Sequence, residues 1–467
     1  MEITRTNSPI IMTTGFLGLN DDCLMEIMSY LNIRELYAME RVCTDLKNVV
    51  ESVYKRFKTL NFDELAERKK ISLIELKLFA KRVGECVTNL TARSSSFEIG
   101  ADYYIIDILL DHFKKVQNLN IADFPLLFLK MDELIEISCN LKSAKFMSCD
   151  LNDDVQRCLA VAGNLESIDL SYNPLNGKCF EELSNLREFD ATCCEVKFEG
   201  FFISLLQRNP TLKKVGIPSG CITQDSIEAI RRFLPELEAV SFSHFCFGGC
   251  HINLQILANL PNLTEVKLEC FNQGNIHNFM ESLAEYDRLT CLNLRISDYH
   301  SLLHVKRFTN LKYINICCRK LKNEHLMEFM SKKTLQKIIV DSMLLTDDLC
   351  KFITECPSLT YLEVRRAEKI TEVFLDGLTP YLDGRTVPLT IYVFRTGIKE
   401  SNERTLHPML RLNIEEVKMS YSDDEDDEHS QSSEDNDNSD DNDSWIGIGE
   451  EEEIGDFYEE SSEESDE

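Results

Sequence analysis

The chain has 467 residues, of which 43% are hydrophobic, so it is long enough to bury a large core and has the composition of a soluble globular protein. Its formal net charge of −30 is concentrated at one end, because residues 421–467 contain 23 Asp or Glu and no Lys or Arg. The nearly balanced remainder excludes a strongly basic nucleic-acid binder.

The sequence shows neither a membrane-spanning segment nor a signal peptide. No run approaches the roughly 18 apolar residues that span a bilayer, and residues 1–15 lack the basic patch and apolar core of a signal peptide. We therefore expect a cytoplasmic or nuclear protein with neither a membrane nor a nucleic acid as a partner, and with a flexible segment over residues 1–15.

Residues 16–58 predict three short helices. The first follows Asn20, a good N-cap residue, and its apolar residues recur at i, i+3, i+4 and i+7 as Leu24, Ile27, Met28 and Leu31. Asn32 and Glu35 have the spacing of a capping box for the second helix, and the third begins near Thr44. So small a helical group makes a poor independent core, so we expect it to dock on something.

This helical segment resembles the F-box family in three stretches: residues 19–31 (LNDDCLMEIMSYL), 34–36 (REL) and 41–46 (RVCTDL). Asn20 stands where the family usually has proline, and Leu46 where it often has tryptophan. The resemblance implies binding to the Skp adaptor of a Skp–cullin–F-box ubiquitin ligase, and through it to a cullin–RING ligase. The residues implied to form or support the Skp-facing surface are Leu19, Leu24, Ile27, Leu31, Leu36, Val42, Cys43 and Leu46. The alternative is that these residues only pack on the first repeat of the chain.

Residues 59–400 repeat an apolar frame with the spacing L-x-x-L-x-L. The middle positions of its thirteen copies are Leu60, Leu90, Leu119, Ala144, Ile168, Phe189, Val215, Val240, Val266, Leu292, Ile314, Ile338 and Leu362. They lie 21 to 30 residues apart, the range of leucine-rich repeats. Alternation within each frame predicts a short strand with one face in a shared core, and residues 389–393 are a candidate terminal strand.

The segments between the frames predict helices, with N-caps at Thr223 and Thr346. Cys149, Asn173 and Cys194 fall where a polar side chain satisfies backbone groups of the turn after a strand. We therefore expect an α/β solenoid: a leucine-rich-repeat arc of about 13 repeats with concave strands and convex helices, preceded by a three-helix F-box. Residues 401–420 would be a terminal cap, and residues 421–467 a disordered acidic tail.

An F-box followed by leucine-rich repeats implies a substrate-recognition adaptor that holds an unidentified protein on the concave face. The candidate substrate-binding residues are Asp169, Asp190, Phe245, Arg295, Lys337 and Arg365. Acids come early and bases late in this set, which would suit a bipolar target whose acidic or phosphorylated part meets the late bases. The alternative is an ordinary solvated face of mixed charge.

The sequence contains no convincing motif for catalysis or for metal binding. His244, Cys246, Cys250 and His251 include one half of a zinc-binding spacing, but no second pair lies nearby and they straddle a predicted strand. The chain has no phosphate-binding loop, dinucleotide loop or C-x-x-C. We expect no catalytic residues, no metal and no cofactor.

The acidic tail has two interpretations. Aromatic and aliphatic residues interrupt it and could anchor a basic partner such as a histone: Trp445, Ile446, Ile448, Phe457 and Tyr458. Otherwise it only keeps the protein soluble. Acidic-tailed leucine-rich-repeat proteins that bind histones or activate the Ran GTPase are therefore the rival to the adaptor, and the F-box-like segment favours the adaptor.

Overall fold

The computed structural model describes residues 18–63, 65, 72–94, 101–125, 127–243, 252–270, 274–296, 299–329, 334–399 and 406–415. All of them belong to the first of two units of the chain, residues 1–418. The predicted flexible N-terminus and the predicted acidic tail lie outside the described residues. Among the helices described, none is both long and apolar enough to pass through a bilayer.

The chain begins with three short helices, as the sequence predicts: α1 (Asp21–Ser29), α2 (Ile33–Glu40) and α3 (Thr44–Tyr54). The Oδ1 atom of Asn20 accepts a hydrogen bond from the backbone N–H of Cys23 at 2.9 Å and caps α1. Asn32 and Glu35 form the predicted capping box of α2. These caps satisfy donors that a helix leaves unpaired at its start.

A parallel sheet of 15 strands in sequence order follows in the described part of the chain. The strands are β1 (Thr59–Asn61), β2 (Asn89–Arg93), β3 (Asn118–Ala122), β4 (Ser143–Met147), β5 (Ser167–Asp169), β6 (Glu188–Asp190), β7 (Lys214–Ile217), β8 (Ala239–Ser243), β9 (Glu265–Cys270), β10 (Cys291–Ile296), β11 (Tyr313–Cys317), β12 (Lys337–Asp341), β13 (Tyr361–Arg365), β14 (Leu389–Phe394) and β15 (Leu410–Glu415). Each of the thirteen predicted frames lies on one of β1–β13. Two strands come after them, and β15 lies where we expected only a terminal cap.

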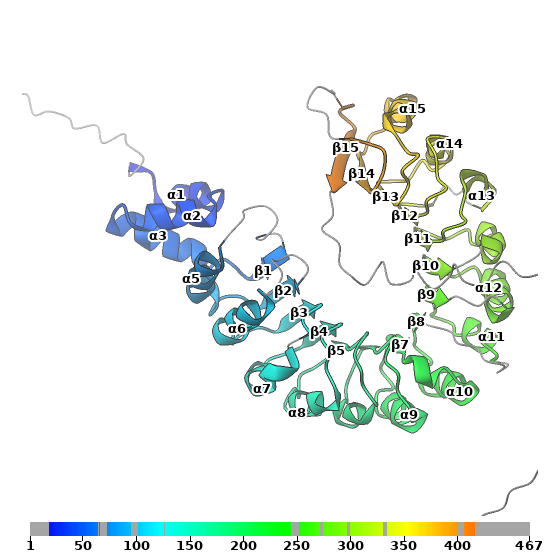
Figure 1. Cartoon of the computed structure of the whole chain (residues 1–467), viewed down its shortest axis with the longest axis horizontal. Helices are drawn as coiled ribbons and strands as arrows, with labels where there is room; N and C mark the ends of the chain where they lie inside the picture. Colours follow the sequence, from blue (N-terminus) through cyan, green and yellow to red (C-terminus); the bar gives the residue numbers. More distant parts are fainter. Residues whose placement is uncertain are drawn as a thin grey trace, which may run out of the picture. The chain divides into compact units, whose positions relative to one another are not determined.

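Helices join the strands and cover the outer side of the curved sheet, while the strands line its inner side (Figure 1). The α-helices after the first three are α5 (Leu73–Val83), α6 (Asp102–His112), α7 (Met131–Ser138), α8 (Gln156–Leu159), α9 (Glu199–Arg208), α10 (Gln224–Phe233), α11 (Gln255–Ala258), α12 (Gly274–Tyr286), α13 (Asn323–Phe329), α14 (Leu349–Thr354) and α15 (Glu372–Leu382). Short 3-10 helices complete the connections: η3 (Leu127–Lys130), η4 (Asp153–Val155), η5 (Lys178–Glu182), η6 (Ser219–Cys221) and η7 (Tyr299–Arg307). The predicted solenoid with concave strands and convex helices is confirmed.

The two predicted helix caps have different outcomes. Thr223 caps α10, because its side chain accepts a hydrogen bond from the backbone N–H of Ser226 at 3.1 Å. The prediction for Thr346 is wrong, since α14 begins at Leu349. The Thr346 hydroxyl instead accepts a hydrogen bond from the side-chain amide of Asn323 at 2.7 Å and ties two neighbouring repeats together.

Asn173 organises the turns after β4 and β5. Its Oδ1 atom accepts hydrogen bonds from the backbone N–H groups of Cys149 and Leu151, each at 3.0 Å. Its Nδ2 atom donates to the backbone carbonyls of Phe146, Leu170 and Ser171 at 2.6, 2.8 and 3.1 Å. The side chain is 2% exposed, so these bonds satisfy backbone groups that water cannot reach, as the sequence predicts.

Candidate functional site

The eight residues implied to serve the Skp adaptor divide between the core and the surface of the helical segment. Leu24, Leu36 and Leu46 are at most 3% exposed and form its core. Leu31 and Cys43 are half-buried against that core. Leu19, Ile27 and Val42 are exposed by 41%, 40% and 64%. Only these last three present a large apolar surface to a partner, whereas the buried residues support the helices that carry them.

A fourth exposed apolar side chain, Tyr30, is 80% exposed and was missed by the sequence analysis. It lies at the end of α1, three residues after Ile27, and its hydroxyl donates to the Glu26 carboxylate at 3.0 Å. The spacing of three residues puts Ile27 and Tyr30 on one side of the helix and could have identified it. We call Leu19, Ile27, Tyr30 and Val42 the head surface.

A packed joint fixes the helical segment to the first repeat. Phe79 of α5 is 1% exposed, and its ring centre lies 5.5 Å from that of Phe57 and 6.2 Å from that of Tyr54. Arg34 of α2 donates two hydrogen bonds to the Glu75 carboxylate, at 2.6 and 3.0 Å. Such a two-pronged pair is geometrically specific. The joint therefore holds the head surface in a set orientation to the first repeat.

The ionisation of Glu75 reflects this joint. The Arg34 guanidinium, followed by the backbone N–H and the hydroxyl of Ser72, donates hydrogen bonds to the carboxylate and lowers the pKa of Glu75 to about 2. A second ion pair joins Arg82 of α5 to Glu40 at the end of α2, at 2.8 Å. The Glu75 carboxylate stays charged at neutral pH, so its electrostatic attraction to Arg34 adds to the aromatic packing.

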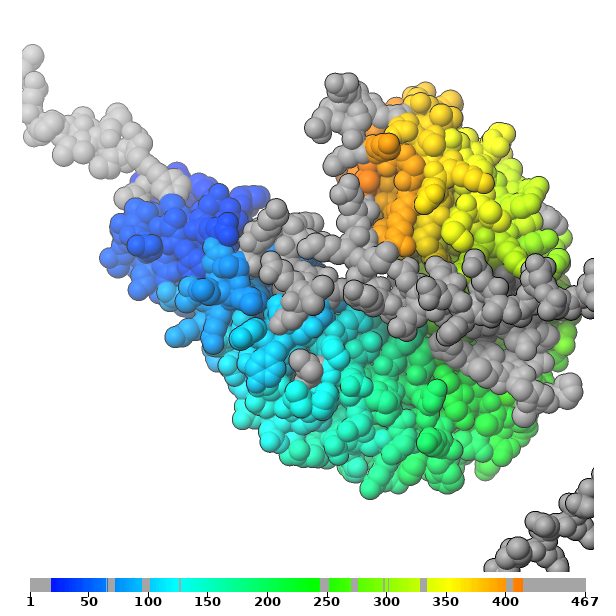
Figure 2. Space-filling model, viewed as in Figure 1, coloured from blue at the N-terminus to red at the C-terminus, as the bar shows by residue number. Residues whose placement is uncertain are grey.

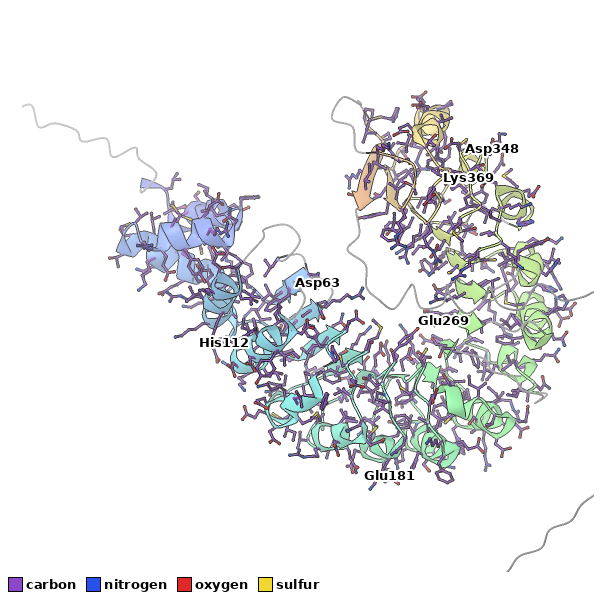
Figure 3. The ribbon with its side chains drawn as sticks, viewed as in Figure 1. Asp63, His112, Glu181, Glu269, Asp348 and Lys369 are labelled. Carbon is purple, nitrogen blue, oxygen red and sulfur yellow. The ribbon has the colours of Figure 1, made fainter. Side chains whose placement is uncertain are left out.

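The inner face is the surface formed by the strand residues that point away from the core. Figure 3 shows Asp63 and Glu269 on this side and His112 and Glu181 on the helical side. The parallel register makes straight rows across the sheet, because Asp169 lies opposite both Lys145 and Asp190, and Arg295 lies in line with Cys317. Figure 2 shows the colours following one another in order over the surface, so each part of it belongs to consecutive repeats.

The predicted substrate-binding residues fall into two separate groups on this face. Asp169 and Asp190 are neighbours on β5 and β6. Arg295, Lys337 and Arg365 lie on β10, β12 and β13, and Phe245 lies outside the described residues. At least three strands separate the groups, so the structure does not bring the predicted set together into one site.

Between and beside these residues lie charges that the sequence analysis did not consider. Arg365 pairs with Glu363 at 2.5 Å, and Arg366 pairs with Asp341 at 2.6 Å. Lys267 pairs with Glu269 at 2.9 Å in the middle of the sheet. The expected change from early acids to late bases stays a prediction, and acids also lie on the late strands, where Glu363 pairs with Arg365.

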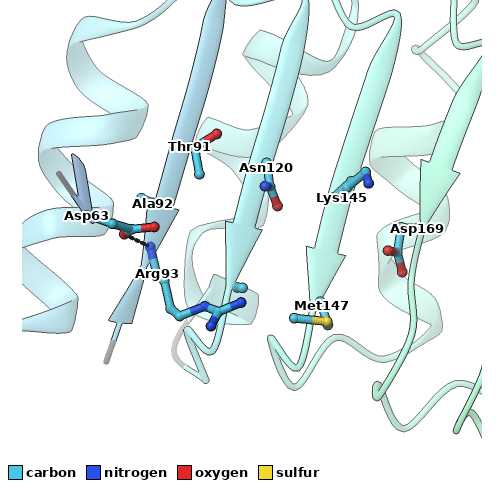
Figure 4. A pocket seen from close by; sticks show the side chains of 9 residues that line it. Asp63, Thr91, Ala92, Arg93, Asn120, Lys145, Met147 and Asp169 are labelled. Carbon is cyan, nitrogen blue, oxygen red and sulfur yellow. Dashed lines mark hydrogen bonds between the residues drawn. The ribbon is translucent and has the colours of Figure 1, made fainter. Parts of the chain in front are cut away.

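A shallow hollow of about 190 Å³ lies over β1–β5 (Figure 4). Its polar lining includes Asp63, Arg93, Lys145 and Asp169, with Thr91 and Asn120 between them. The Asp63 carboxylate accepts a hydrogen bond from the backbone N–H of Arg93 at 2.7 Å. Because two acids and two bases line it, the hollow suits a polar segment of protein better than a simple anion or cation.

The loops after β5 and β6 reach across the inner face. The Tyr172 hydroxyl donates to the Glu269 carboxylate of β9 at 2.9 Å, and the backbone N–H of Cys193 donates to the Ser243 hydroxyl of β8 at 2.7 Å. Tyr172 and Glu269 are 97 residues apart in the chain. No local pattern predicts such a contact, because it depends on the curvature accumulated over four repeats.

Asp190 is an acid on this face whose ionised form is disfavoured by its surroundings. Burial, and then the charge of the neighbouring Asp169 carboxylate, raise the pKa of Asp190 to about 6 from an ordinary value of 3.8. The backbone N–H and the hydroxyl of Thr192 donate to it at 2.9 and 2.7 Å. A Cβ atom at Gly216 of β7 would lie 2.1 Å from its Oδ1 atom, so glycine leaves the room that the carboxylate occupies.

We expect Asp190→Asn to stabilise the protein at neutral pH. Because the folded-state pKa is above the unfolded value, ionised Asp190 opposes folding; its penalty is full above the folded pKa and disappears as pH falls through 6 towards 4. Asn keeps the shape and the acceptor without the charge. Urea unfolding should show the variant more stable at pH 7.5 by at most about 2–3 kcal/mol, with no gain near pH 4. A gain that does not change with pH would contradict the assignment.

The described residues contain no group of three or more His, Cys, Asp or Glu side chains placed to hold a metal ion. The candidate zinc residues, His244 to His251, lie outside the described part of the chain. Fifteen cysteines of the described part are free thiols.

Comparisons with known proteins give one family match and a set of similar structures. The F-box domain model matches residues 16–58, and no curated protein matches the chain. Among solved structures, the chain is similar to the yeast complex of Rad7 and Elc1, with a TM-score of 0.47 and 17% identity, over 82% of this chain and 98% of that one. An internalin, inlF, from Listeria monocytogenes gives a TM-score of 0.32 and 12% identity, over 78% of this chain and 96% of that one.

The family match and the fold are independent observations. The match covers the three helices α1–α3, and the remaining described residues form strand and helix units that stack in sequence order. Each unit contributes one strand to a single parallel sheet, as expected for leucine-rich repeats. The chain therefore carries an F-box domain, followed by a solenoid with the fold of leucine-rich repeats.

Proposed function

We propose that this protein is a substrate-recognition adaptor of a Skp–cullin–F-box ubiquitin ligase. The head surface on the F-box would bind the Skp adaptor, and through it the cullin–RING ligase. The inner face of the repeats would hold a protein target. The protein would perform no catalysis itself and would act in the cytoplasm or the nucleus.

The observation that carries the proposal is the exposed apolar surface of the F-box domain. Ile27, Tyr30 and Val42 are 40%, 80% and 64% exposed on a segment of only three helices. A few side chains that a partner fully covers, often tyrosine or tryptophan, contribute most of the affinity of protein interfaces, and burying apolar side chains such as Ile27 and Val42 is favourable in itself. Exposure of these apolar side chains to water is unfavourable, and a Skp adaptor that bound here would bury them.

The joint between the F-box and the repeats supports the same function. Phe79 and the Arg34–Glu75 pair fix the head surface on the first repeat, and β1–β15 form one continuous sheet. An adaptor of this kind presents its target at a defined distance and direction from the ligase. A rigid scaffold with an open inner face meets that requirement, whereas a flexible linker would not.

Affinity capture of the full-length protein from cells, analysed by mass spectrometry, tests the proposal. We expect a Skp adaptor and a cullin among the captured proteins, and we expect Ile27→Asp to lose both while retaining proteins bound to the repeats. Capture of histones or of the Ran GTPase without Skp or cullin would contradict the adaptor function and favour an acidic-tailed binding module instead.

A further inference from the structure

One lysine on the inner face is held by aromatic rings instead of by an acid. The Nζ atom of Lys337 on β12 lies 4.3 Å from the ring centre of Tyr361 and 5.4 Å from that of Tyr313. The three residues lie side by side in one row, because Tyr313 and Tyr361 are its register partners on β11 and β13. Among the described residues no carboxylate lies within ion-pair distance of Lys337.

The charges around Lys337 are otherwise neutralised in pairs. Glu363 accepts hydrogen bonds from Arg365 at 2.6 Å and from the Tyr361 hydroxyl at 2.7 Å. Asp341 accepts a hydrogen bond from Arg366 at 2.6 Å. Within this described group, Lys337, Arg365 and Arg366 face only Glu363 and Asp341, and the net positive charge that remains belongs to the half-buried ammonium group of Lys337.

The surroundings of this ammonium group are apolar and aromatic. The rings of Tyr361 and Tyr392 are stacked, with their centres 5.1 Å apart. Ile339 occupies an inner-face position, in register with Glu363, yet it is only 6% exposed. Tyrosine and arginine around an apolar centre are typical of the residues that dominate protein interfaces, and an apolar setting strengthens an ion pair formed within it.

We propose that Lys337, between Tyr313 and Tyr361, binds the side-chain carboxylate of an Asp or Glu in the protein target. The inference rests on the proposed function, since it requires the inner face to be the surface that recognises the target. A carboxylate carries one negative charge, which matches the one positive charge of Lys337. A phosphate carries nearly two, and the guanidinium groups that would bind it, those of Arg365 and Arg366, already have acidic partners.

The carboxylate would approach over the row of tyrosines and accept hydrogen bonds from the ammonium group. The rings hold Lys337 in place without neutralising it, because a cation–π contact leaves the charge of the ammonium group intact. Removing the ammonium group should weaken binding of an acidic segment about tenfold, the size expected for one hydrogen bond between charged groups in a partly buried site.

A random peptide library displayed on phage, selected on the purified full-length chain without a Skp adaptor, tests the inference. We expect the recovered peptides to share an Asp or Glu at one fixed position. Lys337→Met should lose this preference, and Lys337→Glu should replace it with Lys or Arg. The matched control is Lys214→Met, in the same row on β7, because Lys214 already pairs with Glu188 at 3.4 Å. This control should keep the acidic preference.

The possible results separate this inference from the proposed function. Peptides that lack a preferred acid, or whose preferred acid survives Lys337→Met, overturn the inference and leave recognition on the inner face standing. A resynthesised peptide that binds more tightly with phosphoserine in place of the acid overturns the choice of a carboxylate. Failure to recover any peptide overturns both the inference and peptide recognition by the inner face. Binding of the Skp adaptor to the head surface, measured separately, is unaffected by any of these results.

Discussion

Ile27→Asp should weaken binding of the Skp adaptor by about 100-fold or more without unfolding the protein. Ile27 is 40% exposed on α1, so the free chain tolerates a charge there. In the complex the carboxylate would be buried without a partner, and a loss of about 3 kcal/mol corresponds to about two orders of magnitude in affinity. Titration calorimetry with purified proteins measures the loss, and circular dichroism checks the fold.

Two variants serve as controls for this result. Ile74→Asp changes an isoleucine of α5 that is 74% exposed but lies outside the head surface, and it should bind the Skp adaptor like the native chain. Leu24→Asp changes a residue that is 3% exposed in the core of the same helix, and it should unfold the F-box. Equal weakening by the substitutions at Ile27 and Ile74 would show that the head surface is not the docking surface.

Asn173→Ala should destabilise the repeats by about 4 kcal/mol, because the backbone N–H groups of Cys149 and Leu151 lose their acceptor in a buried turn and each costs about 1–3 kcal/mol. Three backbone carbonyls also lose a donor. Urea unfolding followed by circular dichroism should show a lower midpoint. Limited proteolysis should show earlier cleavage near β4 and β5, where the lost bonds lie.

Asn140→Ala is the matched control for this effect. Asn140 is exposed, and its side chain donates one hydrogen bond to the Lys114 carbonyl at 3.0 Å. Water can replace that bond, so the free energy of unfolding should change by less than about 1 kcal/mol. If both asparagine variants unfolded at the same urea concentration, the buried hydrogen bonds of Asn173 would not be a main source of stability in the repeats.

The repeats could be predicted because their information is local. Each frame carries its own alternation, and stacking of identical frames fixes the register, so Ile168 lies opposite both Ala144 and Phe189. The strand β15 has the same frame, with Met409 in place of the first leucine before Leu412 and Ile414. The sequence analysis did not predict this strand, because methionine replaces the leucine by which the frame is recognised and no clear helical pattern precedes the strand.

The candidate site could be predicted only in part. Spacing identifies the apolar residues of the F-box but does not say which pack inward, and Leu24 and Ile27 differ in burial although both belong to one predicted stripe. On the inner face the sequence identifies Lys337. The frames also place Tyr313 and Tyr361 beside it, but they do not reveal the ring contacts of its ammonium group or the pairing of Arg365, because side-chain orientation decides both.

The most direct measurement is the mass of the complex formed when purified full-length protein is mixed with a Skp adaptor and a cullin and separated by size-exclusion chromatography with light scattering. A single species containing one copy of each protein is the expected result, and with Ile27→Asp the chain should elute apart from a Skp–cullin pair. Elution of the native chain at its own mass, beside an intact Skp–cullin pair, would contradict the assignment of this protein as a ligase adaptor.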